Sequence, residues 1–112
     1  MLEFFEKYSE SSFRYKDKRA WPIILKTSKK VILKTIKEVF PDYGFVNLVI
    51  NEDFGECFCI NGDCEITITL LNNGPNVEIN LAVFSDKFGK TFRKLKQVNE
   101  LLSTLFEGFQ IC

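Results

Sequence analysis

Three of the four cysteines lie close together, in the spacing Cys57-x-Cys59-x4-Cys64, and Cys112 follows far along the chain. Three or four thiolates can hold zinc in a closed tetrahedral site. This spacing differs from the paired C-x2-C of zinc knuckles and ribbons. Free cysteine also packs like a small apolar side chain and is often buried. The sequence therefore favours core packing, with zinc binding and thiol–disulfide chemistry as alternatives, and we assign no metal and no cofactor.

The dipeptide Asn61-Gly62 is a strong signal for a two-residue hairpin turn. Such a turn would place Cys59 opposite Cys64 in a non-hydrogen-bonded pair. There the Cβ atoms are ~4.5–5.5 Å apart, against ~3.5–4.5 Å in a disulfide. A bond between these thiols would be strained and easily reduced. We therefore predict free thiols in the native protein.

The usual catalytic constellations are missing from the sequence. The chain has no histidine, which removes His-based triads and His-containing metal sites. It also has no glycine-rich phosphate loop of a known kind. Glu56, Glu65 and Glu78 are predicted on an open sheet surface, where a carboxylate is normally solvated, and no nucleophile or base converges on them. We expect a protein that is not an enzyme.

The elements that position these side chains start with a sheet over residues 45–84. Turn signals at 52–55, 61–62 and 72–75 separate four strands with period-two alternation. The pairings expected around these turns set Ile50 opposite Cys57, and Ile68 opposite Ile79. All three turns agree on one apolar face, formed by Leu48, Ile50, Cys57, Cys59, Cys64, Ile66, Ile68, Leu70, Val77, Ile79, Leu81 and Val83.

The opposite face of this sheet must then point outward. The same pairings predict one row of Val49, Phe58, Glu65 and Ala82 across the four strands. They predict a neighbouring row of Asn47, Ile60, Asp63 and Phe84. This surface is mixed, with a moderate apolar cluster at one end.

Two segments are predicted before the first helix. Residues 2–10 are expected to form a short amphipathic helical turn, with Leu2, Phe5 and Tyr8 on one side. In residues 13–18, Phe13 and Tyr15 alternate with basic residues, which is typical of a protected edge strand.

Two helices are predicted on either side of the central strands. The first begins with Pro22 at its first position and ends at Pro41 and Gly44. The second begins with a cap at Ser85 or Asp86 and ends near Gly108. Its apolar stripe consists of Phe88, Phe92, Leu95, Val98, Leu102, Leu105 and Phe109.

The expected order is strand, helix, four strands, helix. It predicts a single α+β domain over residues 1–112: a two-layer sandwich, with both helices on one face of an antiparallel sheet. Residues 1–10 either fold onto the body or extend from it. In element order, the chain resembles one half of the TATA-binding-protein fold or a small helix-grip (Bet v 1-like) fold. The helix-grip resemblance implies a pocket between the last helix and the sheet.

The net charge of zero hides an asymmetric distribution. Residues 1–40 hold ten Lys or Arg against five Asp or Glu, residues 41–85 hold none against seven, and residues 86–112 hold five against three. A sheet that binds nucleic acid needs basic side chains for the phosphates. The outward face offers Phe58 and Phe84 but only acidic charges, so we expect no sequence-specific nucleic-acid binding. The lysines of the first helix are interpreted as a solvated face.

Composition and length complete the expectations. No apolar run approaches the roughly 18 residues of a membrane span, and the N-terminus lacks the order of a signal peptide. We expect a cytoplasmic protein with reduced thiols.

The leading functional hypothesis is a non-catalytic protein-interaction domain. Its partner would be a basic protein or a second copy of the chain, and its surface would comprise Val49, Phe58, Ile60, Glu65, Ala82 and Phe84. The alternative is a carrier of a small apolar ligand. Its pocket would be lined by Leu48, Cys57, Cys59, Ile68, Ile79, Phe92, Leu95 and Phe109.

Overall fold

Four strands form an antiparallel meander in the middle of the chain. In the computed structural model, which describes residues 7–111, they span β3 (Val46–Asn51), β4 (Glu56–Asn61), β5 (Cys64–Asn73) and β6 (Asn76–Ser85). The strands pair in chain order, β3 with β4, β4 with β5 and β5 with β6. The prediction of four successive strands is confirmed.

The register at the β4–β5 hairpin differs by two residues from the prediction. Asn61 pairs with Cys64, and Cys59 faces Ile66 instead of Cys64. The turn begins at Gly62, whose φ of 61° is a conformation that glycine adopts without steric cost. Because side chains alternate with a period of two, a shift of two residues keeps every side chain on its predicted face.

The β5–β6 hairpin shows the same kind of shift. Leu70 faces Ile79, not Val77, because the turn consists of two residues, Gly74 and Pro75, where four were predicted. The φ of Gly74 is again 61°. The β3–β4 turn was predicted correctly, with Ile50 opposite Cys57 and Val49 opposite Phe58.

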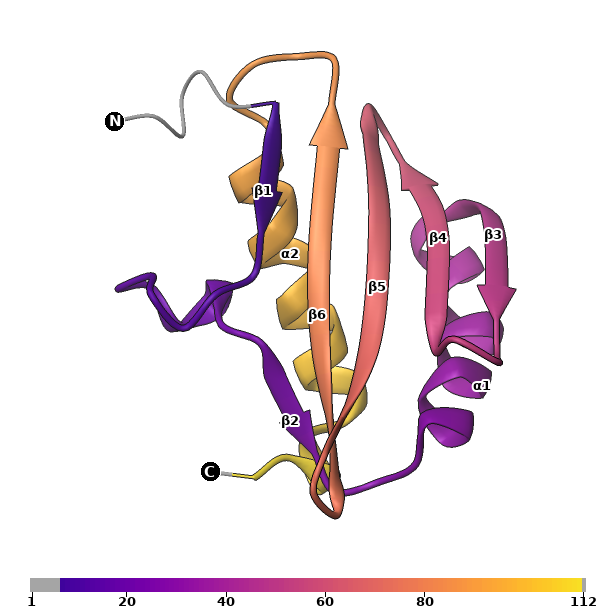
Figure 1. Ribbon diagram of the computed structural model, residues 1–112. Helices are drawn as coiled ribbons and strands as arrows, with labels where there is room; N and C mark the ends of the chain where they lie inside the picture. Colours follow the sequence, from indigo (N-terminus) through magenta and orange to yellow (C-terminus); the bar gives the residue numbers. More distant parts are fainter. Residues whose placement is uncertain (1–6, 112) are drawn as a thin grey trace.

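Two short strands complete the sheet beside β6. They are β1 (Tyr8–Glu10) and β2 (Ile23–Leu25), and both pair antiparallel with β6. The described chain thus forms a six-stranded sheet in the order β1–β6–β5–β4–β3, with β2 next to β1 along β6 (Figure 1). The predicted helical turn is wrong for Tyr8–Glu10, and its other positions, Leu2 and Phe5, lie outside the described residues.

The segment between β1 and β2 is an excursion away from the sheet, so the predicted strand over residues 13–18 is wrong. Its aromatic residues pack sideways instead of alternating: the Phe13 ring lies 5.7 Å from Trp21, and Tyr15 lies 4.9 Å from Phe92. The excursion includes the 3-10 turn Lys18–Ala20. Ser11 starts it and still belongs to the ladder, since its N–H donates to the Leu81 carbonyl at 2.9 Å.

Helix α1 (Lys29–Val39) starts later than predicted. Its N-cap is Ser28, whose Oγ accepts from the Val31 N–H at 3.2 Å. Pro22 instead precedes strand β2, a position that proline tolerates as well as the start of a helix. The predicted end is confirmed: a 3-10 turn, Phe40–Tyr43, follows α1 and closes at Gly44 with a φ of 83°.

Helix α2 (Thr91–Leu105) is shorter at both ends than its apolar stripe indicated. Neither Ser85 nor Asp86 caps it, because the N-cap position is Lys90 and the Ser85 Oγ accepts from the Lys87 N–H in a local turn. Phe88 precedes the helix and is exposed, and Phe109 lies in the following 3-10 turn, Glu107–Phe109, also exposed.

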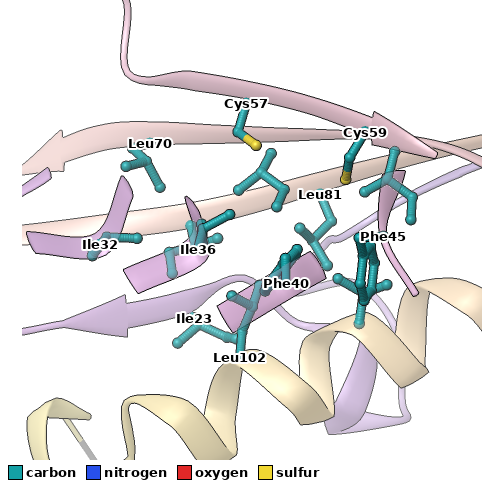
Figure 2. Packing of buried hydrophobic residues seen from close by; sticks show 14 of the residues in the cluster. Ile23, Ile32, Ile36, Phe40, Phe45, Cys57, Cys59, Leu70, Leu81 and Leu102 are labelled. Atoms are coloured by element: carbon teal, nitrogen blue, oxygen red, sulfur yellow. The ribbon is translucent and has the colours of Figure 1, made fainter. Parts of the chain in front are cut away.

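Both helices lie behind the sheet in Figure 1, with α2 packed against β1 and β6. The predicted apolar face supplies ten of the 22 buried apolar residues of the core, α1 adds Ile32, Leu33 and Ile36, and α2 adds Leu95, Val98 and Leu102. Figure 2 shows side chains from the two layers meeting around Ile36, Phe40 and Leu81. The α+β class with an antiparallel sheet is confirmed, and the predicted order is corrected by a second strand before α1.

Candidate functional site

The outward face of the sheet carries two neighbouring rows of paired residues that run from β3 to β1. The first row consists of Val49, Phe58, Thr67, Ala82 and Glu10. The second row consists of Val46, Ile60, Glu65, Phe84 and Tyr8. All six residues predicted for a partner surface lie in these rows.

The composition of the rows differs from the prediction for two reasons. The two-residue shift at the β4–β5 hairpin moves Glu65 from the first row to the second and brings Thr67 in; Asp63 lies in the turn. A bulge in β3 puts Val46, not Asn47, opposite β4 in the second row. Asn47 takes up the extra residue with a φ of 55°, a conformation that asparagine tolerates better than most residues.

Large apolar side chains are exposed along both rows. Phe58 and Phe84 are 40% and 42% exposed, and Val49 is 58% exposed. Tyr8 and Val46, which the sequence analysis did not select, are 48% and 54% exposed. We call the surface formed by these five residues, with the half-buried Ile60 and Ala82 between them, the outward patch. Contiguous exposed apolar surface on a soluble protein often marks an interaction site.

The charges within these rows are negative. Glu65 lies between Ile60 and Phe84, and Glu10 accepts a hydrogen bond of 3.0 Å from the Tyr8 hydroxyl. Burial, and then that bond to Glu10, raises the pKa of Tyr8. Residues 41–85 and the strands β1 and β2 contain no Lys or Arg, so the strands bring no positive charge to this face.

A shallow hollow of about 190 Å³ opens on this face beside the β3 bulge. It is lined by Asn47, Phe58, Cys59, Ile60, Glu65, Ile66 and Thr67. Its size suits one inserted side chain of a partner better than a drug-sized ligand, whose sites typically measure about 300–1,000 Å³.

The residues predicted to line an interior pocket do not all come together. Cys57, Cys59, Ile68, Ile79 and Leu95 are buried in the core, and Leu48 and Phe92 pack against it. Phe109 lies apart at 45% exposure, where its carbonyl accepts from the Lys26 N–H at 2.8 Å. In Figure 2, Cys57 and Cys59 face Ile36, Phe40 and Phe45. The carrier function stays a prediction, and the buried residues act here as packing.

The three described cysteines are free and buried. The hydrogen bond between the thiols of Cys57 and Cys59 raises the pKa of Cys59, and burial raises it further. Burial also raises the pKa of Cys64. The hydrogen bond to Cys59 lowers the pKa of Cys57, but this thiol is buried like the other two, and buried structural cysteines are poor nucleophiles. Cys59 does not pair with Cys64, so the predicted geometry for a strained cross-strand disulfide is wrong.

The residues that sequence reasoning missed come from short or irregular segments. Tyr8 lies in a three-residue strand, which is too short for alternation to be recognised. Val46 was hidden by the bulge, whose only signal is an asparagine in a strand. Cys112, considered as a fourth zinc ligand, lies outside the described residues.

Comparison with protein-family models, with curated proteins and with solved structures finds no significant match to this chain. Within residues 7–111, no three Cys, Asp or Glu side chains gather closely enough to hold a metal ion. Neither α1 nor α2, the helices of that same range, is long and apolar enough to cross a membrane.

Proposed function

We propose that this chain is a non-catalytic protein-interaction domain that docks a partner on the outward patch. The observation that carries the proposal is the pairing register, which lines up Val46, Val49, Phe58, Phe84 and Tyr8 as exposed apolar side chains across neighbouring strands. The core of a protein interface is typically apolar and enriched in aromatic side chains. A surface of this composition on a rigid sheet fits a protein better than a small molecule.

The charge of the surface indicates the nature of the partner. Glu65 and Glu10 flank the apolar side chains, so a partner with basic side chains around an apolar centre would complement both features. Electrostatic complementarity of this kind mainly increases association rate and specificity. The same surface on a second copy of the chain would bring like charges together, which makes self-association the weaker form of the proposal.

Two observations support a role without catalysis. The chain has no histidine, and its buried cysteines face the core, away from the outward face. Glu56 and Glu78 lie on the sheet surface away from any nucleophile, and Glu78 accepts hydrogen bonds from the Asn73 and Asn80 side-chain amides. An acid–base pair needs a positioned substrate site between two carboxyl groups. Neither glutamate borders such a site, and we interpret both as surface residues.

We also propose that the architecture belongs to the same broad group as half of the TATA-binding-protein fold or the helix-grip fold. The four-strand meander and the two helices behind it support this resemblance. The pairing of β1 and β2 with β6, the last strand, fixes how the N-terminal segment joins the sheet. No function follows from this resemblance alone.

A photo-crosslinking experiment tests the proposal. Benzoylphenylalanine is placed at Phe58 or Phe84, and crosslinked products from cells producing the tagged protein are identified by mass spectrometry. Phe54, which is 71% exposed in the β3–β4 turn, and Phe109, which is 45% exposed after α2, are the matched control positions. We expect one defined protein product from the patch positions and none from the controls.

The double variant Phe58→Ser/Phe84→Ser should then abolish formation of that complex while the protein stays folded. Both side chains point outward, so circular dichroism and the unfolding midpoint should change little. If the double variant binds the crosslinked partner with unchanged affinity, the outward patch is not the binding surface.

A further inference from the structure

Strand β3 forms one edge of the sheet, opposite the edge formed by β1 and β2. Within residues 7–111 it pairs with β4 and with no other strand. The strand sequence, Val46 to Asn51, contains no charged residue and no proline, the residues that natural proteins use to protect edges. Its protection is limited to the bulge at Asn47, so the backbone groups from Leu48 to Asn51 remain a regular template for another strand.

Helix α1 overhangs this edge and forms a groove with it. The groove has a volume of about 1010 Å³ and is open to solvent. Its apolar lining comes from Leu33 and Pro41 on one side and from Leu48 and Ile50 of β3 on the other. A chain that extends the sheet at β3 would therefore also cover these side chains.

Three lysines of α1 line the same groove. Lys30, Lys34 and Lys37 follow one another at helical spacings of four and three, so they form a stripe along the helix. Their side chains make no ion pair or hydrogen bond with any residue of the described chain. Lys30 and Lys34 lie about 6 Å apart along the helix axis, close to the roughly 6.6 Å between successive inward-facing positions of a strand.

We propose that the groove between α1 and the β3 edge binds an extended acidic segment of another protein by strand addition. The segment pairs its backbone with β3 from Leu48 to Asn51. The carboxylates of the segment face the α1 lysines. The methylene groups of the same acidic side chains cover Leu33 and Ile50. Its alternate side chains point outward beside Val49. Glu52 and Asp53 close one end of the groove, so the segment is acidic in its middle and neutral or basic at that end.

A second copy of this chain fits the groove less well. Strand β3 of another copy brings no carboxylate to the lysines, because its own acidic residues, Glu52 and Asp53, lie beyond the strand in the turn. Covering the lysines with an uncharged strand would remove water from their charges without a compensating partner. Charge complementarity therefore selects an acidic segment.

The test uses a seven-residue peptide with capped ends, in which glutamate alternates with valine or threonine. Binding to the full chain is followed by NMR, with amide shift changes expected in β3 and α1. Two further peptides carry N-methyl groups on every second amide, in the two alternate phases. Because only one edge of the peptide pairs with β3, one methylated peptide should lose binding and the other should keep it.

The lysines are tested with the triple variant Lys30→Gln/Lys34→Gln/Lys37→Gln. It should bind the peptide about tenfold more weakly, because the variant loses the small binding free energies of three exposed ion pairs together. The matched control, Arg14→Gln/Lys16→Gln/Lys26→Gln, changes the net charge equally at exposed positions outside the groove and should bind within about twofold of the unmodified chain, since distant charges are screened.

Three results would overturn the proposal. Equal binding by both methylated peptides would exclude strand addition. Shift changes around Phe58 and Phe84 in β4 and β6, without changes in α1, would place the peptide on the outward patch. A dimer through β3 that excludes the peptide would make a second copy the occupant. The Phe58→Ser/Phe84→Ser variant tests only the outward patch, and the peptide experiments test only the groove. Either proposal can therefore be refuted without affecting the other.

Discussion

The side-chain amide of Asn99 in α2 donates a hydrogen bond of 2.7 Å to the main-chain carbonyl of Trp21. The same Nδ2 donates to the Arg19 carbonyl at 2.8 Å, and Asn99 is 3% exposed. One buried amide thus ties the last helix to the excursion between β1 and β2. That excursion ends in β2 and begins after β1, so Asn99 helps to hold the two strands that flank β6.

Replacing this amide should therefore destabilise the whole domain. We expect Asn99→Ala to lower the free energy of unfolding by about 2 kcal/mol, because two carbonyls lose their donor. The control is Glu100→Ala, which removes a neighbouring exposed contact of 3.6 Å to Arg19 and should cost less than about 0.5 kcal/mol. Urea unfolding measures both, and equal effects would refute the role of Asn99.

The buried thiols give a second prediction. In a Cys112→Ser variant, Cys57, Cys59 and Cys64 should react with Ellman's reagent at mildly alkaline pH only as fast as the protein opens. Burial and the bond between Cys57 and Cys59 raise the pKa of Cys59, which keeps its thiol protonated at that pH.

All three thiols should react at once in guanidinium chloride without reductant. A rapid reaction of one thiol in the native state would show that it is accessible. If only one thiol per chain reacted in the denatured protein, the other two would be joined in a disulfide.

The turn between β4 and β5 gives a prediction for acid stability. Lys87 and Lys90 each lie 3.2 Å from the Asp63 carboxylate, and their hydrogen bonds hold its pKa below the usual range. A carboxyl with a depressed pKa in the folded state stabilises the fold above its unfolded pKa of about 3.9, and this contribution disappears as pH falls through the folded pKa.

The variant Asp63→Asn should accordingly melt at a lower temperature than the unmodified chain near neutral pH, and the difference should vanish in strong acid. High salt should reduce the difference, because these groups are exposed. Asp53→Asn, in the β3–β4 turn, is the control. A difference that persists unchanged in acid would show that it does not come from the ion pairs.

The faces of the sheet were predictable, and the details of its register were not. Alternation assigns a residue such as Phe58 to one face whatever its partner, so a two-residue slip leaves the assignment correct. Whether Glu65 or Thr67 lies beside Phe58 depends on the position of a two-residue turn, for which Asn61-Gly62 and Gly62-Asp63 are both suitable. The position of the acidic side chain within the outward patch could therefore be determined only from the structure.

The sequence alone could not predict where the helices end or where the N-terminal strands lie, for physical reasons. Pro22 fits either the start of a helix or the start of an outer strand, and the choice is made by pairing with β6. Phe88 and Phe109 continue the apolar spacing of α2, but Gly89 in a left-handed conformation separates Phe88 from the helix. Strands of three residues, such as Tyr8–Glu10, are specified by tertiary pairing rather than by local pattern.

The attachment of both β1 and β2 to β6 has a consequence for folding kinetics. Hairpins of neighbouring strands close short loops, so β3 to β6 can assemble from local contacts. The pairing of Tyr8 with Phe84 must instead close a loop that spans most of the chain, and such contacts slow folding. We expect a late step in which the N-terminal strands dock, and until that step β6 presents an open edge through which partly folded chains can aggregate.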